Sequence, residues 1–294
     1  MINGVLNVWK EAGFTSHDVV AKLRGILHQK KIGHTGTLDP DATGVLPVCL
    51  GKGTRLCDML TDETKTYEAL LHLGIATDTQ DMSGTVTAEA PVTVTEEEVR
   101  DCIASFVGEQ QQVPPMYSAL KVNGKKLYEL AREGIEIERK ARTVHFYEIS
   151  ILEVKLPLVR MEVTCSKGTY IRTLLEDIAA AMGQKGTMSA LRRVAAGVYS
   201  EADAHTLEEI QAAKDVGPEA LQALMLPVES VFASLPLLVA DERVEQHLYN
   251  GCPTSRYPAA DGRYRVRSAG GQFLGLANVV NGVLKVEKLF VERN

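Results

Sequence analysis

The 294-residue sequence is 45% hydrophobic and 24% charged, which is typical of a globular protein with room for one large domain and one small domain. No apolar run approaches the roughly 20 residues that a membrane-spanning helix needs, and the N-terminal residues show no basic leader with a cleavable apolar core. The five cysteines are scattered and form no C-x-x-C pair, so neither a disulfide framework nor a thiolate zinc site is indicated. We therefore expect a cytoplasmic protein without a membrane anchor.

The net charge of -6 argues against nucleic-acid binding when it is taken alone, because phosphate contacts supply much of the affinity of such proteins. The charge is unevenly distributed, with acidic residues concentrated between residues 62 and 109. An acidic protein can still hold a basic groove, although each cation by itself is better explained as a solvated surface charge. The basic residues gather at Lys30, Lys31, Lys121, Lys125, Lys126, Arg139, Lys140, Arg142, Lys167, Arg172, Arg192 and Arg193.

The predicted elements of the N-terminal half begin with a helix that Thr15 or Ser16 can cap. Residues 31–52 are rich in glycine and proline and are predicted to form a loop. Residues 66–73 alternate between apolar and polar side chains, which predicts a strand. A capping box at Thr95 predicts the start of another helix. The apolar positions of the first helix recur at helical spacing at Val19, Val20, Leu23, Ile26 and Leu27.

The C-terminal half mixes the same kinds of element. Residues 158–165 alternate like a strand, and after a turn at residues 166–168 they lead into a predicted helix that ends at Gly183. Further helical signals occupy residues 206–210 and 218–226. From about Leu235 short strands alternate with glycines, which indicates a separate small β-rich domain. Strands and helices without regular βαβ alternation predict an α+β fold.

The sequence contains no motif that is typical of the common cofactor-dependent or metal-dependent enzymes. Gly51 and Lys52 fail as a phosphate-binding loop, because Leu46 and Gly53 stand where that loop needs glycine and a hydroxyl residue. Leu56 occupies the third glycine position of a dinucleotide fingerprint that would start at Gly51. The seven histidines are dispersed and form no H-E-x-x-H pattern. We therefore expect neither a cofactor nor a metal.

The most informative segment is residues 33–47, which places Asp39 in a glycine-rich loop. Pro40 biases the aspartate toward an extended backbone, and glycines such as Gly36 let a ligand or another backbone approach closely. On spacing alone, an Asx-type turn at Asp39 or Asp41 explains the pattern equally well.

The same segment resembles the G-H-x-G-x-L-D-P-x-A-x-G-x-L signature of the tRNA pseudouridine synthase B family, which also includes guide-RNA-dependent archaeal and eukaryotic synthases. Residues 65–67 resemble the family's K-x-Y strand motif, 112–124 its RNA-clamping insertion, 166–172 its third motif and 191–193 its fourth. One departure is Glu11, which stands where the family usually has a proline. The nine matching positions of the signature are Gly33, His34, Gly36, Leu38, Asp39, Pro40, Ala42, Gly44 and Leu46.

The resemblance implies a catalytic fold with a central mixed, mainly antiparallel sheet flanked by helices. It implies a catalytic domain over residues 1–230, an RNA-clamping insertion at about 110–142 and a PUA-like RNA-binding domain over 235–294. The implied reaction isomerises uridine-55 in the T-loop of tRNA to pseudouridine after the base has been flipped out. The implied partner is the T-arm of tRNA, and we expect a monomer that needs no guide RNA.

By the same resemblance, Asp39 is the nucleophile and Arg172 is the cation that keeps it ionised in a dry site. Tyr67 stacks on the uracil and is a candidate acceptor of the C5 proton. Without the family match, Arg172 would be read as solvent-exposed and Tyr67 as a core residue. Further contacts to the RNA are expected at His34, Gly36, Tyr170, Leu191, Lys65, Lys121, Lys125, Lys126 and Lys167.

Two other functions fit the same scaffold. A non-catalytic RNA-binding or RNA-folding protein would not need to keep Asp39, Tyr67 and Arg172. A guide-RNA-dependent synthase acting on ribosomal RNA is disfavoured by the long basic insertion, which looks like that of the stand-alone bacterial enzymes.

Overall fold

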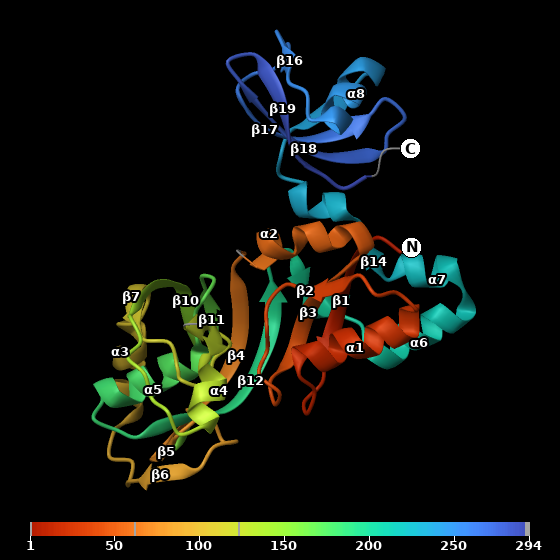
Figure 1. Cartoon of the computed structure of the whole chain (residues 1–294). Helices are drawn as coiled ribbons and strands as arrows, with labels where there is room; N and C mark the ends of the chain where they lie inside the picture. Colours follow the sequence, from red (N-terminus) through yellow and green to blue (C-terminus); the bar gives the residue numbers. More distant parts are fainter. Residues whose placement is uncertain (1, 62, 123, 292–294) are drawn as a thin grey trace.

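A ten-stranded mixed sheet forms the body of the molecule in the computed structural model, which describes residues 2–61, 63–122 and 124–291 (Figure 1). The strand order is β14-β1-β3-β12-β4-β11-β10-β7, with β2 beside β3 and β13 beside β12. The pairing is antiparallel except between β3 and β12, so the predicted mixed, mainly antiparallel sheet is confirmed. The strands are β1 (Gly4–Lys10), β2 (Ile32–His34), β3 (Thr43–Leu50), β4 (Lys65–Leu73), β7 (Gly108–Gln112), β10 (Arg142–Lys155), β11 (Leu158–Cys165), β12 (Gly186–Ala196), β13 (Tyr199–Ser200) and β14 (Met225–Leu226).

Helices cover the sheet through two separate cores. The helices α1 (Ser16–Leu27), α6 (Leu207–Val216) and α7 (Pro218–Ala223) bury their apolar residues with those of β1 and β3. The helices α3 (Glu96–Ala104) and α5 (Ile171–Ala181) pack over β4, β11 and β12. The predicted caps at Thr15 and Thr95 are confirmed: each accepts from a backbone N–H in the first turn of α1 and α3, and Thr206 caps α6 in the same way. The fold is therefore α+β, as predicted.

Two predictions of local structure were wrong. Residues 31–52 are not a loop throughout, because β2 and β3 lie within them. The run from Val45 to Leu50 is fully buried in the sheet, and Pro47 still uses its carbonyl to accept from the Thr35 N–H at 3.1 Å. The helix predicted over residues 218–226 ends at Ala223, because Met225 and Leu226 pair with β1 as a strand instead.

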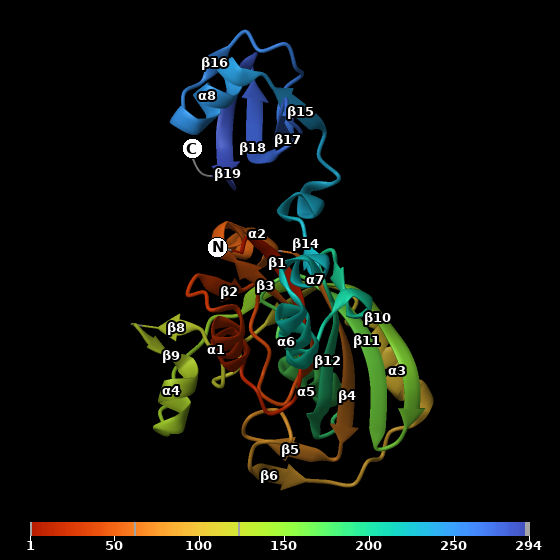
Figure 2. The ribbon, with the colours of Figure 1, turned by 90° about the vertical axis from the view of Figure 1, so that its right-hand side faces the viewer.

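Two chain segments outside the main sheet lie beside the loop that carries Asp39. The insertion carries β8 (Lys121–Val122), β9 (Lys125–Lys126) and α4 (Leu127–Arg132), and Figure 2 shows these elements projecting from the body of the main sheet. Because β7 belongs to the main sheet, the described part of the insertion outside the sheet is residues 113–122 and 124–141. A second loop, residues 78–85, connects β5 (Ile75–Thr77) to β6 (Val86–Glu89).

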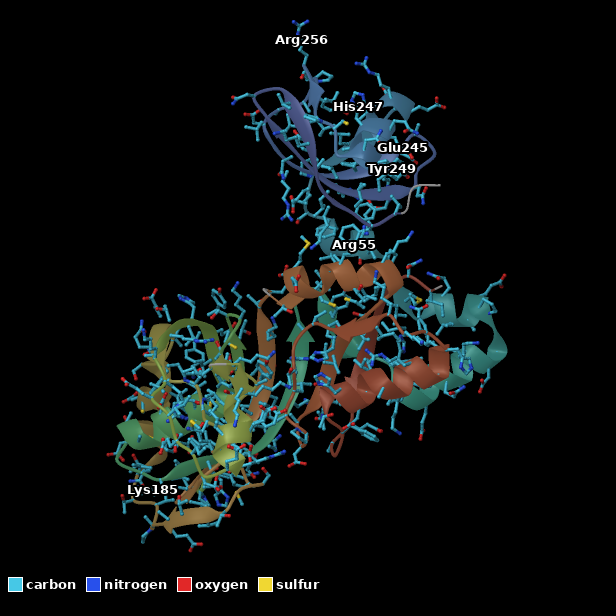
Figure 3. The ribbon with its side chains drawn as sticks, viewed as in Figure 1. Arg55, Lys185, Glu245, His247, Tyr249 and Arg256 are labelled. Carbon is cyan, nitrogen blue, oxygen red and sulfur yellow. The ribbon has the colours of Figure 1, made fainter. Side chains whose placement is uncertain are left out.

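A separate five-stranded sheet makes up the small C-terminal domain, which confirms the predicted β-rich tail (Figure 1). Its strands are β15 (Leu237–Ala240), β16 (Thr254–Ser255), β17 (Gly262–Ser268), β18 (Phe273–Val280) and β19 (Val283–Leu289), and α8 (Glu242–Asn250) packs against them. The rings of Phe232, Phe273 and Phe290 pack together where the two domains meet; Phe273 stacks on the other two, which are tilted to each other. Arg55 lies at this junction in Figure 3, and its guanidinium donates to the Leu289 carbonyl.

None of the helices in the described ranges is long and apolar enough to cross a membrane.

Candidate active site

A cleft of about 1820 Å³ opens between the Asp39 loop, the 78–85 loop, the insertion and the N-terminus of α5. Asp39, Tyr67, Tyr170, Arg172 and Leu191 all line it. These residues come from sequence segments up to 152 positions apart (Asp39 to Leu191), so the sheet brings the four matched motifs to one place.

Asp39 lies between β2 and β3 at the start of a turn, in which the Ala42 N–H donates to the Asp39 carbonyl at 3.2 Å. Lys10, the last residue of β1, is fully buried, and its ammonium donates to the carbonyls of Ala42 and Pro40 at 2.5 and 2.8 Å and of Glu11 at 3.1 Å. Burial lowers the pKa of Lys10 to about 8, and the negative charge of Asp39 opposes that change. The turn is closed by backbone groups and not by the Asp39 side chain, as an Asx turn would be, and it places Asp39 in the wall of the cleft.

Arg172 occupies the first turn of α5, and its guanidinium faces the Asp39 carboxylate. Its Nε lies 3.0 Å from Asp39 Oδ2, and one terminal nitrogen donates to Asp39 Oδ1 at 3.2 Å. The Arg172 side chain is 6% exposed and also donates to the carbonyls of Thr79 at 2.9 Å and Tyr117 at 2.8 Å. One buried guanidinium thus joins the Asp39 loop, the 78–85 loop and the insertion.

Asp81 is a residue of this site that the sequence analysis missed. Its Oδ2 lies 3.5 Å from Arg172, while its Oδ1 accepts from Thr79 Oγ1 at 2.8 Å and from the Ser83 N–H at 3.0 Å. The only signal in the sequence was the polar run over residues 78–85, which resembles an ordinary acidic surface loop. Arg172 therefore lies between two carboxylates.

Burial raises the pKa of the Asp39 carboxyl above its ordinary value of 3.8, and the neighbouring charge of Asp81 adds to the rise. Arg172 is the main opposing influence, and Lys10 is a weaker one. The expected role of Arg172, to favour the ionised carboxylate, matches this geometry.

Tyr67 lies on β4 directly across from Arg193 on β12. Burial raises the pKa of the Tyr67 phenol, and the guanidinium of Arg193 opposes the rise. Arg193 is 1% exposed and donates to the carbonyls of Val45 at 2.6 Å and Gly36 at 3.2 Å. Arg193 belongs to the fourth motif, but its contact with the Asp39 loop could not be inferred from sequence.

The remaining expected contacts divide between the cleft and its supports. Gly36, Tyr170 and Leu191 line the cleft. His34 lies behind it: its Nδ1 accepts from the Gly36 N–H at 3.3 Å, and burial lowers its pKa to about 4. The ring of His17, which does line the cleft, contacts the His34 ring with 5.4 Å between centroids.

The predicted lysines also differ in their placement. Lys65 lines the cleft but is only 8% exposed, and its ammonium donates to the carbonyls of Thr61 and Glu63. Lys126 lines the cleft together with Arg132, and both cations face the ring of Tyr128 at 5.3 and 5.4 Å from its centroid. The other three, Lys121, Lys125 and Lys167, are exposed and lie outside the residues that line the cleft.

Among the described residues, no group of three or more His, Cys, Asp or Glu side chains is arranged to hold a metal ion.

Comparison with known proteins places the chain among pseudouridine synthases. Residues 24–171 match the N-terminal domain of the TruB family pseudouridylate synthases, and residues 172–233 match the tRNA pseudouridylate synthase B C-terminal domain. The tRNA pseudouridine synthase B of Clostridium perfringens (strain 13 / Type A) is 42% identical over 299 residues, covering 99% of this chain and 100% of the relative. The protein of that name from Lachnoclostridium phytofermentans is 52% identical over 259 residues, covering 85% of this chain and 83% of the relative.

Solved structures agree with the family match. A chain of the "Crystal Structure of a Cbf5-Nop10-Gar1 Complex" superposes with a TM-score of 0.76 at 28% identity, covering 99% of this chain and 85% of that one. A chain of the "Structure of H/ACA RNP bound to a substrate RNA containing 2'-deoxyuridine" gives 0.76 at 26% identity, covering 99% and 86%. The motifs, the cleft and these relatives agree, and the chain belongs to the TruB family of pseudouridylate synthases.

Proposed function

We propose that this protein isomerises uridine-55 in the T-loop of tRNA to pseudouridine, with Asp39 as the nucleophilic carboxylate. The reaction breaks the N1–C1′ bond, rotates the uracil, joins C5 to C1′, releases the C5 proton and adds a proton to N1. It is redox-neutral and hydrolyses nothing. The protein must therefore supply a nucleophile, a cation that balances the charge of this nucleophile, and a pocket that holds the flipped base.

The observation that carries the proposal is the double contact of Arg172 with Asp39, at 3.0 and 3.2 Å, inside the cleft that Tyr67 also lines. A carboxylate that becomes buried under substrate loses hydration and needs a fixed cation to stay ionised. The planar guanidinium supplies two donors in the geometry of a carboxylate. A protein that only binds RNA has no need for this arrangement.

The base reaches Asp39 only after it leaves the loop stack, which costs a few kcal/mol. Stacking on one aromatic ring returns ~1–3 kcal/mol per base, so Tyr67 offsets much of that cost. Leu191 supplies an apolar wall of the pocket. By the resemblance, His34 helps to occupy the space that the flipped base leaves. Burial lowers its pKa to about 4, so the imidazole is neutral near pH 7.

The RNA backbone meets the cations around the cleft. We place phosphate contacts at Lys126 and Arg132 within the cleft and at Lys121, Lys125 and Lys167 on the exposed surface. The C-terminal domain acts as a PUA-like RNA-binding module, as its resemblance implies. The protein works as a monomer in the cytoplasm and uses no guide RNA.

The test is tritium release from a T-arm hairpin that contains C5-tritiated uridine. The purified chain is expected to release the label, and Asp39→Asn is expected to abolish release while binding the hairpin with similar affinity. Binding without release by the unaltered chain would assign it to the RNA-binding class instead. Release only after a guide RNA is added would assign it to the guide-dependent class.

A further inference from the structure

Gln80 stands out because its backbone is in the left-handed region, with φ at 65°. L-residues with a Cβ rarely adopt this conformation, and glycine or asparagine adopts it more readily. Such strain persists when surrounding contacts over-determine the conformation. The contacts of Gln80 therefore indicate what holds the 78–85 loop in this conformation.

The Gln80 amide binds α5 at two places. Its Oε1 accepts from Thr173 Oγ1 at 3.0 Å, and its Nε2 donates to the Glu176 carboxylate. Thr173 directly follows Arg172, and Glu176 lies one turn further along, so the amide grips the turn of α5 that carries Arg172. Thr173 is 4% exposed, so its hydroxyl has little access to water as an alternative partner.

The neighbours of Gln80 on either side are the groups that hold Arg172 from the loop. The Thr79 carbonyl accepts from Arg172 at 2.9 Å, and the Asp81 carboxylate lies 3.5 Å from it. The loop is also attached to β12, since the Met188 N–H donates to the Gln80 carbonyl at 3.0 Å. Removing the amide would therefore leave the loop folded on β12 but free to shift along α5.

We propose that Gln80 is a positioning residue, whose side-chain amide locks the 78–85 loop to α5 and so sets the orientation in which Arg172 meets Asp39. The proposal rests on the proposed function, because it assigns Gln80 to the same reaction. It predicts a loss in rate without a loss in RNA binding, since the Gln80 amide is engaged by protein groups.

Two variants of Gln80 separate the contribution of the amide from that of the strained backbone, and a third variant serves as the control. Gln80→Ala removes the amide and keeps the strained backbone, whereas Gln80→Gly removes both. The matched control is Gln184→Ala, because the Gln184 amide also pins a loop, through Thr93 Oγ1 at 3.0 Å and the Thr93 N–H at 3.2 Å, at the opposite end of α5. The measurement is single-turnover tritium release at saturating enzyme, together with the Kd for the same hairpin.

We expect both Gln80 variants to release tritium about 10- to 100-fold more slowly, the range that a small misplacement of a catalytic group produces. Their Kd should stay within about twofold of the unaltered chain, and Gln184→Ala should keep the unaltered rate. Release by Gln80→Gly at the unaltered rate would overturn the proposal. If the unaltered chain itself releases nothing, the proposed function fails, which is a distinguishable result.

A pH profile adds a readout that a purely structural role would not move. Asp39 is faced by Arg172 from α5, by Asp81 from the 78–85 loop and by Lys10 from β1. Arg172, which lowers the pKa of Asp39, is a larger influence than Asp81, which raises it. Loosening both contacts should therefore move the acid limb of the rate to higher pH in both Gln80 variants. An acid limb at the position of the unaltered chain would contradict the proposal even if the rate fell.

Discussion

At the scale of single residues, the site is a compact set of charges. Arg172 lies between Asp39 and Asp81, and the ammonium of Lys10 lies under the turn that presents Asp39. Burial is the main reason that the pKa of Asp39 is raised, and the charge of Asp81 adds to the rise. Arg172 and, more weakly, Lys10 oppose it.

The raised pKa of Asp39 predicts an acid limb in the rate above pH 3.8, the ordinary value for this carboxyl. The nucleophile must be ionised, so tritium release should fall as the pH drops through the folded-state pKa. Arg172→Lys should move the limb to still higher pH, because a point charge replaces the two-donor fork. Single-turnover release between pH 4 and 8 measures both; a limb below about 3.8 would contradict the assignment.

The same shift has a consequence for stability, with the opposite sign from a usual salt-bridged carboxylate. A group whose folded pKa is raised takes up its proton more readily in the folded state. Asp39 therefore favours folding below its unfolded pKa, and this contribution is lost as the pH rises through the folded pKa. Asp39→Asn should remove that pH dependence from the free energy of unfolding.

At the scale of elements, the parallel contact of β3 with β12 places the Asp39 loop against Arg193. The contact is close at Gly44, where φ is 104° and a Cβ would lie 2.2 Å from the Arg193 carbonyl oxygen. The Arg193 carbonyl is part of the backbone of β12, so it cannot move aside as the end of a flexible side chain could. The two strands can therefore meet here only through glycine.

Gly44→Ala is expected to destabilise the fold by about 2–4 kcal/mol, from strain at positive φ together with separation of β3 and β12. The matched control is Gly25→Ala in α1, where a Cβ would meet nothing within 4 Å. That change should stabilise the helix by roughly 0.5–1 kcal/mol. Urea unfolding of both variants measures the difference, and equal midpoints would show that the strands do not meet as described.

The insertion is the element expected to give RNA binding its salt dependence. Replacing Lys126 and Arg132 with glutamine should flatten the slope of log Kd against log salt by about 0.7–0.9 units for each lost phosphate contact. Lys155→Gln is the control, since Lys155 pairs with Glu153 and lies outside the cleft. Filter binding at several salt concentrations gives the slopes; a slope unaltered by the double replacement would remove this assignment.

At the scale of the whole molecule, local signals could be predicted from sequence, and contacts across the sheet could not. The capping boxes, the strand at residues 158–165 and the domain change near Leu235 each depend on nearby residues. The matched segments likewise predicted that Asp39, Tyr67 and Arg172 act together, and all three line one cleft. Asp81 escaped notice because its importance arises from a contact with Arg172, which is 91 positions away.

One wrong prediction of local structure has the same origin. The strand β3 was predicted as a loop because Gly44 and Pro47 disrupt regular structure in isolation, whereas burial between β1 and β12 outweighs that tendency. Sequence likewise shows the charge of Lys65 but not its burial. For the same reason, the sequence did not show that Lys10 is buried and donates to the turn that carries Asp39. It also did not show how Glu11, in place of the family's proline, takes part in these contacts. The backbone carbonyl of Glu11 accepts from Lys10 regardless of its side chain.

The most direct test of the central claim is to map pseudouridine in a full-length, unmodified tRNA transcript after incubation with the unaltered chain or with Asp39→Asn. The account predicts one new pseudouridine, at position 55, with the unaltered chain. It predicts none with the variant, although the variant binds the same transcript. Modification at another position would contradict the assigned substrate, and modification by Asp39→Asn would contradict Asp39 as the nucleophile.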